Sequence, residues 1–250
     1  GVALATLIAE WSGLALGLWL CRAAFAGRQW CDWPRVFDPV RIRRMAQVNG
    51  DIMVRSVLLT GSFTCFMFVG AKFGDVTLAA NQVLIQFLFI TAHGMDGFAF
   101  AAEALIGQAL GAKNRTRLRR SVMLTSFWAA VVIVILTTFF AVFGGWIIDL
   151  MTTSPEVQMA ARVYLIWMIL APCLGGPSWM LDGIFIGATR TADMRNMMAV
   201  SFAGYVVSVL ILLPAFGNHG LWASLMIFFA LRGLTLGARY PSLERGADAA

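Results

Sequence analysis

Four carboxyl side chains stand inside long apolar stretches of the sequence, where a charge is costly. They are Glu10, Asp96, Glu103 and Asp182. If these stretches cross a lipid bilayer, a carboxylate near the centre costs about 2.5 kcal/mol or more, so each acid is a candidate for function. Paired acids can share a proton or bind a cation through their oxygen atoms. These residues therefore predict proton or cation handling, or a substrate cavity, within a membrane.

The acids Asp96 and Glu103 are seven residues apart, which places them on the same side of an unbroken helix. Facing one bundle or cavity, they would act together. Each also has a structural interpretation. Glu103 is close to the basic segment 113–120 and would then lie near the membrane surface, whereas Asp96 would cap a helix half that follows Gly94.

Three other charges also have two interpretations each. Asp182 either takes part in transport or accepts hydrogen bonds from backbone amides freed by a nearby helix break. Arg55 is expected to extend to the cytoplasmic face, with neutralisation of an acid inside the bundle as the alternative. Glu10 either has a functional role or pairs with a helix that is absent from this chain.

The elements that position these charges are predicted to be membrane-spanning helices. Hydrophobic residues make up 60% of the 250 residues and charged residues only 13%, and the mean hydropathy is +0.78. A helix needs about 20 apolar residues to cross the hydrocarbon core. The sequence therefore predicts an all-α, polytopic transmembrane bundle with about seven spans. The candidate spans are 2–24, 52–72, 76–110, 121–148, 160–186, 196–213 and 219–238.

Two of these spans contain residues that disturb straight helices. The span 76–110 is longer than one crossing requires and contains Gly94 and Gly97, which predicts a kink or an extension beyond the bilayer. The span 160–186 contains residues expected to bend or break it, namely Pro172, Gly175, Gly176 and Pro177. Both places are candidate hinges.

The distribution of Lys and Arg predicts an orientation in the membrane. Of nineteen basic residues, fifteen follow the first, third, fifth and seventh spans, and two follow the second, fourth and sixth. Because basic loops stay in the cytoplasm, we expect the amino end of this chain outside and the carboxyl end inside. This placement accounts for the net charge of +6 without a nucleic-acid partner.

The cysteine, histidine and serine residues do not favour an enzyme. The four Cys and two His have no metal-site spacing, so no metal and no cofactor is expected. Ser178 lacks a GxSxG-like setting and no His is near it in the sequence. A membrane-embedded transferase or hydrolase is therefore only a minor alternative.

The chain is expected to begin inside a larger protein and to contain parts of two bundles. It opens directly on an apolar stretch, and an odd number of spans begins outside. Residues 1–25 would be the last span of an amino-terminal lobe and 26–50, rich in Arg, a cytoplasmic linker. Residues 51–240 would form a six-helix lobe and 241–250 a cytoplasmic tail.

Several stretches together resemble the multidrug and toxic compound extrusion (MATE) transporters, in particular their DinF-type branch. These stretches are Gly1–Glu10, Gly74–Gln82, Leu105–Ala112, Leu181–Thr191, Gly220–Ala223 and Arg232–Leu236. The resemblance implies twelve spans in two six-helix lobes with both ends in the cytoplasm. This chain would then be the sixth span followed by the whole second lobe, and the preceding spans would be its partners in a bacterial-type inner membrane.

The resemblance also implies a function. Family members export cationic or lipophilic drugs by alternating access, using an inward flow of H⁺ or Na⁺. Some place cation-binding acids where this chain has the apolar Val57–Leu59 stretch and Gly175–Gly176, so H⁺ is favoured over Na⁺. DinF-type members are thought to use an aspartate on the first span, which this chain does not contain. A lipid-linked saccharide flippase of related two-lobe architecture is the main alternative.

Overall fold

The described part of the protein is helical throughout. In a computed structural model, residues 2–23 and 33–246 are described, and no strand occurs among them. The helices are α1 (Val2–Leu20), η1 (Cys21–Ala23), α2 (Trp33–Val36), α3 (Pro39–Gly70), η3 (Ala71–Phe73), α4 (Asp75–Gly111), α5 (Arg115–Met151), α6 (Pro155–Gly187) and α7 (Thr191–Gly246). Six of them, α1 and α3–α7, are long and apolar enough to cross a membrane. The predicted all-α class is confirmed.

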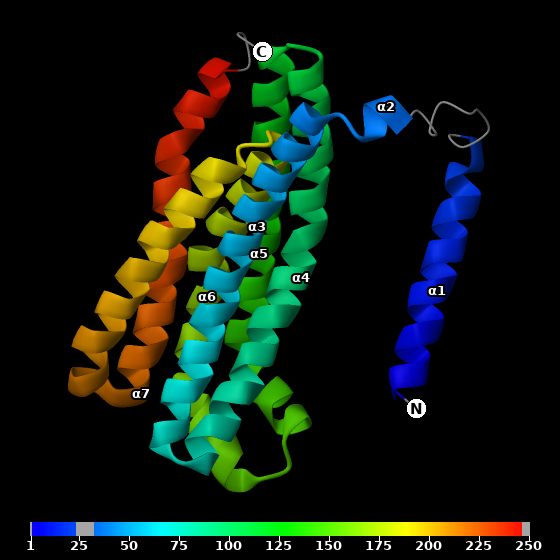
Figure 1. Cartoon of the computed structure of the whole chain (residues 1–250). Coiled ribbons are helices and arrows are strands. Elements are labelled where there is room, and N and C mark those ends of the chain that lie inside the picture. The colour runs from blue at the N-terminus through cyan, green and yellow to red at the C-terminus, as the bar shows by residue number, and fades with distance from the viewer. Residues whose placement is uncertain (1, 24–32, 247–250) are drawn as a thin grey trace. The chain divides into compact units, whose positions relative to one another are not determined.

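Helix α7 contains two legs that run in opposite directions. Gly217 has a non-helical backbone, with φ 55° and ψ −132°, in the middle of this 56-residue element. Figure 1 shows α7 descending in yellow and returning in orange and red. The legs correspond to the predicted spans 196–213 and 219–238, so six apolar helices accommodate the seven predicted spans. A positive φ is accessible to glycine at little cost, which explains why the chain reverses at this residue.

The chain divides into two compact units, residues 1–47 and 48–250, and each is described by itself. In the first unit, α1 is exposed along its described length, and Glu10 is among the exposed side chains. Helix α3 begins at Pro39, inside the segment 26–50 that was assigned to the linker. Residues 26–32 of that segment, and 247–250 of the predicted tail, lie outside the described residues.

The predicted disturbances within α4 and α6 do not interrupt either helix. Helix α4 is continuous from Asp75 to Gly111, past Gly94 and Gly97, so it extends as one long helix. Helix α6 also continues through Pro172 and Pro177, and the predicted break there is absent. Neighbouring helices and local hydroxyl groups can satisfy backbone groups that a proline frees in a membrane helix.

A buried polar cluster joins α4 to the second leg of α7. Asn81 and Asn218 each donate a side-chain amide hydrogen to the other's carbonyl oxygen, at 2.9 and 3.0 Å. Trp222 donates its indole N–H to the same Asn81 oxygen at 2.9 Å and packs edge-on against Phe66 of α3. Polar groups buried this deeply are stable only when they are paired. The cluster therefore fixes the helix that follows the Gly217 reversal against α3 and α4.

The α4–α5 turn, the α6–α7 turn and the carboxyl end of α7 meet at one end of the bundle, which we call the basic end. Arg115 at the start of α5 contacts Glu244 of α7 at 3.3 Å. Arg190 in the α6–α7 turn donates to the carbonyl oxygen of Ser242 at 3.2 Å. The start of α5 is capped by Asn114, whose side chain accepts from the backbone N–H of Arg117 at 2.8 Å.

Candidate functional site

One pocket in the second unit contains every charged residue that the sequence analysis singled out as a candidate, apart from Glu10. The pocket has a volume of about 330 Å³ and lies among α3, α4, α6 and the second leg of α7. Its charged lining residues are Arg55, Asp96, Glu103, Asp182 and Arg232. The structure therefore brings together charges that come from four different helices.

Asp182 is the centre of the charged cluster. Its Oδ2 atom accepts a hydrogen bond from Nη2 of Arg55 and a second one, at 2.5 Å, from Nη2 of Arg232. Asp182 is 7% exposed and Arg232 is 2% exposed. Because one carboxylate faces two guanidinium groups, this buried cluster carries one net positive charge when all three groups are ionised.

Arg232 is the functional candidate that the sequence analysis missed. It was named only as part of the resembling stretch Arg232–Leu236. The structure places its guanidinium carbon 5.5 Å from the centre of the Phe228 ring, in addition to its contact with Asp182. A charged residue within an apolar span is itself a signal of function, and that rule would have found Arg232.

Four polar atoms of the cluster have no partner within the described protein. They are Nε of Arg55, Oδ1 of Asp182, and Nε and Nη1 of Arg232. Leaving a buried polar group unpaired costs about 1–3 kcal/mol, and more when the group is charged. Because buried polar groups are normally paired, these atoms are candidates for hydrogen bonds to water or to a ligand in the pocket.

Asp96 and Glu103 bring two further acids to the same pocket. Both side chains are half-buried, and neither forms a hydrogen bond or an ion pair with another described residue. Together with the three-residue cluster they leave one net negative charge in the pocket when all five groups are ionised. Such a pocket is suited to receive one positive charge, from a proton or from an organic cation.

Two glycines of α6 bring its backbone against that of α4. A Cβ atom at Gly183 would lie 2.5 Å from the carbonyl oxygen of Ala99, and one at Gly187 would lie 2.5 Å from that of Glu103. Spacing of small residues by four allows membrane helices to pack at backbone contact. This close approach explains why Asp182 on α6 shares a pocket with the acids of α4.

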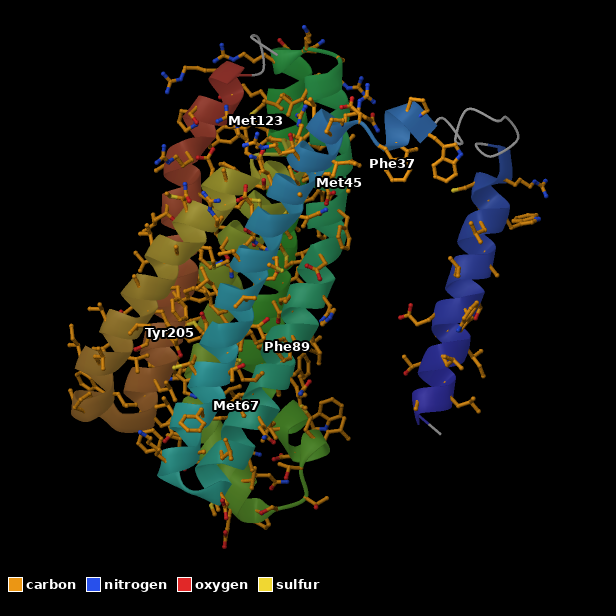
Figure 2. All side chains as sticks on the ribbon, in the orientation of Figure 1. Phe37, Met45, Met67, Phe89, Met123 and Tyr205 are labelled. Carbon is orange, nitrogen blue, oxygen red and sulfur yellow. The ribbon has the colours of Figure 1, made fainter. Side chains whose placement is uncertain are left out.

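The rest of the pocket wall is apolar and includes several aromatic rings. The rings of Phe63 on α3 and Phe89 on α4 are 5.6 Å apart between their centres, and Figure 2 labels Phe89 on the α4 ribbon. Trp179 and Phe229 form a further edge-on pair at 5.8 Å. An apolar, aromatic wall with a few charged groups is the usual composition of a pocket for an organic ligand.

The geometry distinguishes between the alternative interpretations of the charged residues. Arg55 is paired inside the bundle instead of extending to the surface, so the expected snorkelling is wrong. The hydrogen bonds of Asp182 Oδ2 come from side chains rather than from freed backbone amides. Asp96 lies within an uninterrupted helix, so there is no helix start for it to cap. Glu103 lines the pocket with Asp96, as their spacing predicted.

Comparison with curated proteins identifies two groups of relatives. The chain is 40% identical to DNA damage-inducible protein F of Escherichia coli (strain K12), over 95% of this chain and 52% of that protein. It is 24% identical to Protein DETOXIFICATION 44, chloroplastic, of Arabidopsis thaliana, over 77% of this chain and 37% of that protein. The chain thus spans about half the length, or less, of the curated relatives it matches.

Solved structures share the fold. The chain superimposes on the MATE transporter VcmN of Vibrio cholerae in its bent form with a TM-score of 0.81 and 20% identity, covering 94% of this chain and 54% of that one. A mutant of the same transporter gives a TM-score of 0.85 at 21% identity, with coverage of 98% and 56%.

The sequence model of one family matches the chain directly. This family is MatE, and the match covers residues 52–213, most of the second unit. Members of the family are transporters and not enzymes, as the sequence analysis expected. The family match and the identity to the Escherichia coli relative lead to one conclusion: the chain belongs to the MatE family.

Proposed function

We propose that this chain is one lobe, with the last helix of another, of an antiporter that exports cationic or lipophilic compounds in exchange for protons. The observation that carries the proposal is the pocket of five charged residues within a largely apolar bundle. Membership of the MatE family supports a transport role. The orientation deduced from the basic loops would place the carboxyl end in the cytoplasm of a bacterial-type inner membrane.

Exchange follows from the charge of the pocket. With all five groups ionised, the pocket holds an excess of one negative charge, and the unpaired acids are Asp96 and Glu103. A proton on either acid or a bound organic cation removes that excess. Both together would produce an excess positive charge in a medium of low dielectric constant, which is costly. The two occupants therefore exclude each other, and this exclusion is the requirement for antiport.

Asp182 has a different part in this scheme. It accepts hydrogen bonds from both Arg55 and Arg232 and thereby compensates one of their two charges within the bundle. Its removal would leave two guanidinium groups facing each other. We assign the exchangeable proton to Asp96 and Glu103 and assign to Asp182 the positioning of the two arginines. Protons rather than Na⁺ are favoured because a proton needs one carboxylate oxygen, whereas a metal cation needs several oxygen ligands at once, and Oδ2 of Asp182 is already engaged by the two arginines.

Transport requires a second lobe that forms the other wall of the substrate pathway. The chain covers 52% of its Escherichia coli relative, and we propose that a further lobe of the same protein faces α3 and α4. Alternating access would then arise from movement of the lobes relative to each other, biased by protonation of the pocket. The chain alone is accordingly expected to give no drug resistance to a sensitive host.

The test is proton release from proteoliposomes that contain the full-length protein. Adding a lipophilic cation should release protons, and the double variant Asp96→Asn with Glu103→Gln should abolish this release. Asp75→Asn is the matched control, because Asp75 also belongs to α4 but does not line the pocket. Undiminished release by the double variant would refute the assignment of the proton to these acids. Cation export that follows a Na⁺ gradient at constant pH would refute proton coupling.

A further inference from the structure

A second, mostly apolar groove lies between α5, α6 and the second leg of α7. It has a volume of about 360 Å³ and is separate from the charged pocket. Its lining residues are Val122, Ser126, Ala129, Ala130, Ile133, Gly176, Pro177, Met180, Leu181, Ile184, Gly237 and Tyr240. Apart from Ser126 and Tyr240, none of these side chains has a polar group. A groove with this lining is suited to a hydrocarbon chain.

On α5, the side of the helix that lines the groove continues into two arginines. Arg115, Arg119, Val122, Ser126 and Ile133 follow one another at intervals of three, four or seven residues. Residues at these intervals lie on one face of a helix. The groove face of α5 is therefore basic at its first turns and apolar beyond them.

On α7, polar groups are found at the same end of the groove. Tyr240 lines the groove and is half-buried, and Glu244 is one turn further along the helix. The charges of Glu244, Arg119 and Arg115 are near enough to act on the Tyr240 hydroxyl. Arg115 is engaged with Glu244. Arg119 forms no hydrogen bond or ion pair with any described residue, which leaves its guanidinium group available at the end of the groove.

We propose that the groove is a binding site for an anionic phospholipid of the leaflet at the basic end. One acyl chain would occupy the groove beside Ala130 and Pro177. The phosphate would lie at the basic end, where Arg119 supplies a positive charge and Tyr240 a hydroxyl donor. Basic residues at the membrane surface, above a gap between spanning helices, are typical of sites for anionic lipid headgroups.

The charge at the mouth of the groove decides between lipid classes. Arg119, which pairs with no described residue, brings a positive charge there, which complements the single negative charge of phosphatidylglycerol. Phosphatidylcholine with the same acyl chains fits the groove equally well but carries no net charge. Comparing these two lipids therefore separates the contribution of the headgroup from that of the acyl chain.

The experiment is native mass spectrometry of the detergent-purified full-length protein with each of the two lipids at equal concentration. Phosphatidylglycerol should remain bound about fivefold more than phosphatidylcholine, because one basic residue at a membrane surface contributes a factor of about this size. Arg119→Gln should remove the preference and leave phosphatidylcholine binding unchanged. Arg120→Gln is the matched control. It removes the same charge from the next exposed position, which is off the helix face of Val122, Ser126 and Ile133, and should keep the preference.

A second variant tests the groove itself. Ala130 is exposed and lines the groove, so Ala130→Phe should fill it and reduce the binding of both lipids without unfolding the protein. Equal retention of the two lipids by the unchanged protein would overturn the proposal. An equal loss of preference in Arg119→Gln and Arg120→Gln would also overturn it, since the effect would then be one of general surface charge. Unaltered lipid binding by Ala130→Phe would exclude the groove as the site.

Discussion

Asp182 and Arg232, 50 residues apart in the sequence, form a hydrogen-bonded ion pair of 2.5 Å that is almost completely buried. The pair connects α6 with the second leg of α7, and Arg55 adds α3 through the same carboxylate oxygen. Removing one partner of a buried ion pair is more costly than removing the whole set, because the remaining charge is left uncompensated. This difference leads to the first prediction.

Replacing Asp182 by Asn should strongly destabilise the protein. Two guanidinium groups would face each other in the bundle, and breaking a buried pair costs about 3–5 kcal/mol. The midpoint of unfolding in a denaturing detergent titration should fall accordingly. Adding Arg55→Gln to this variant should recover part of the stability, because one uncompensated charge is removed. A double variant less stable than Asp182→Asn would contradict this view of the cluster.

The contributions of the Asn81 and Asn218 side chains to the free energy of unfolding should depend on each other. Asn81→Ala leaves the Asn218 amide and the Trp222 indole N–H unpaired, and Asn218→Ala leaves the Asn81 amide nitrogen unpaired. Each unpaired group is expected to cost about 1–3 kcal/mol. The double change should cost clearly less than the sum of the two, as measured by a double-mutant cycle of unfolding free energies. Gln82→Ala is the control, since Gln82 is next to Asn81 but exposed. Strictly additive losses would mean that the two amides do not stabilise one another.

Gly183→Ala should separate α4 from α6. The new methyl group would meet the backbone of Ala99, which cannot turn aside as a flexible side chain can. Overpacking of this kind costs about 1–3 kcal/mol. We expect a lower melting temperature of the purified protein and a weaker cation-dependent proton release. Wild-type stability and release would show that the two helices are not in backbone contact at this position.

Alanine at Gly94 and Gly97 tests whether these residues are hinges. A Cβ atom at either position meets no other atom within 4 Å, and α4 is helical there. Replacing both glycines should therefore increase helix stability by about 0.5–1 kcal/mol each. If they act as hinges, the rate of transport should fall while the melting temperature rises. Transport at the wild-type rate in the stabilised variant would exclude the hinge role.

Much of the fold was predictable from the sequence because bilayer thickness sets the length of an apolar span. The alternation of Lys and Arg between loops gave an independent reason for the number of spans. The continuity of α6 was not predictable, because whether a membrane helix tolerates prolines such as Pro172 and Pro177 depends on its surroundings, which a single sequence does not give. The structure does interrupt a helix at Gly217, and this residue separates the two predicted spans 196–213 and 219–238.

The sequence predicted which charged residues belong to the candidate site, but not which of them form pairs. Intramembrane charge alone indicated Asp96, Glu103, Asp182 and Arg55, and one pocket contains all four. Arg232 carried the same signal but was assigned no role. The connection of Asp182 to Arg55 spans 127 positions, and Asn81 and Asn218 are 137 apart. Nothing in a single sequence indicates such pairings, because they depend on how distant helices pack.

The sharing of Asp182 also has a mechanical consequence. A single carboxylate on α6 ties α3 to the second leg of α7. Sliding any one of these helices on its own would separate charges within a medium that screens them poorly. The motions of lowest energy therefore carry the three helices together, so that this part of the protein moves as a rigid body.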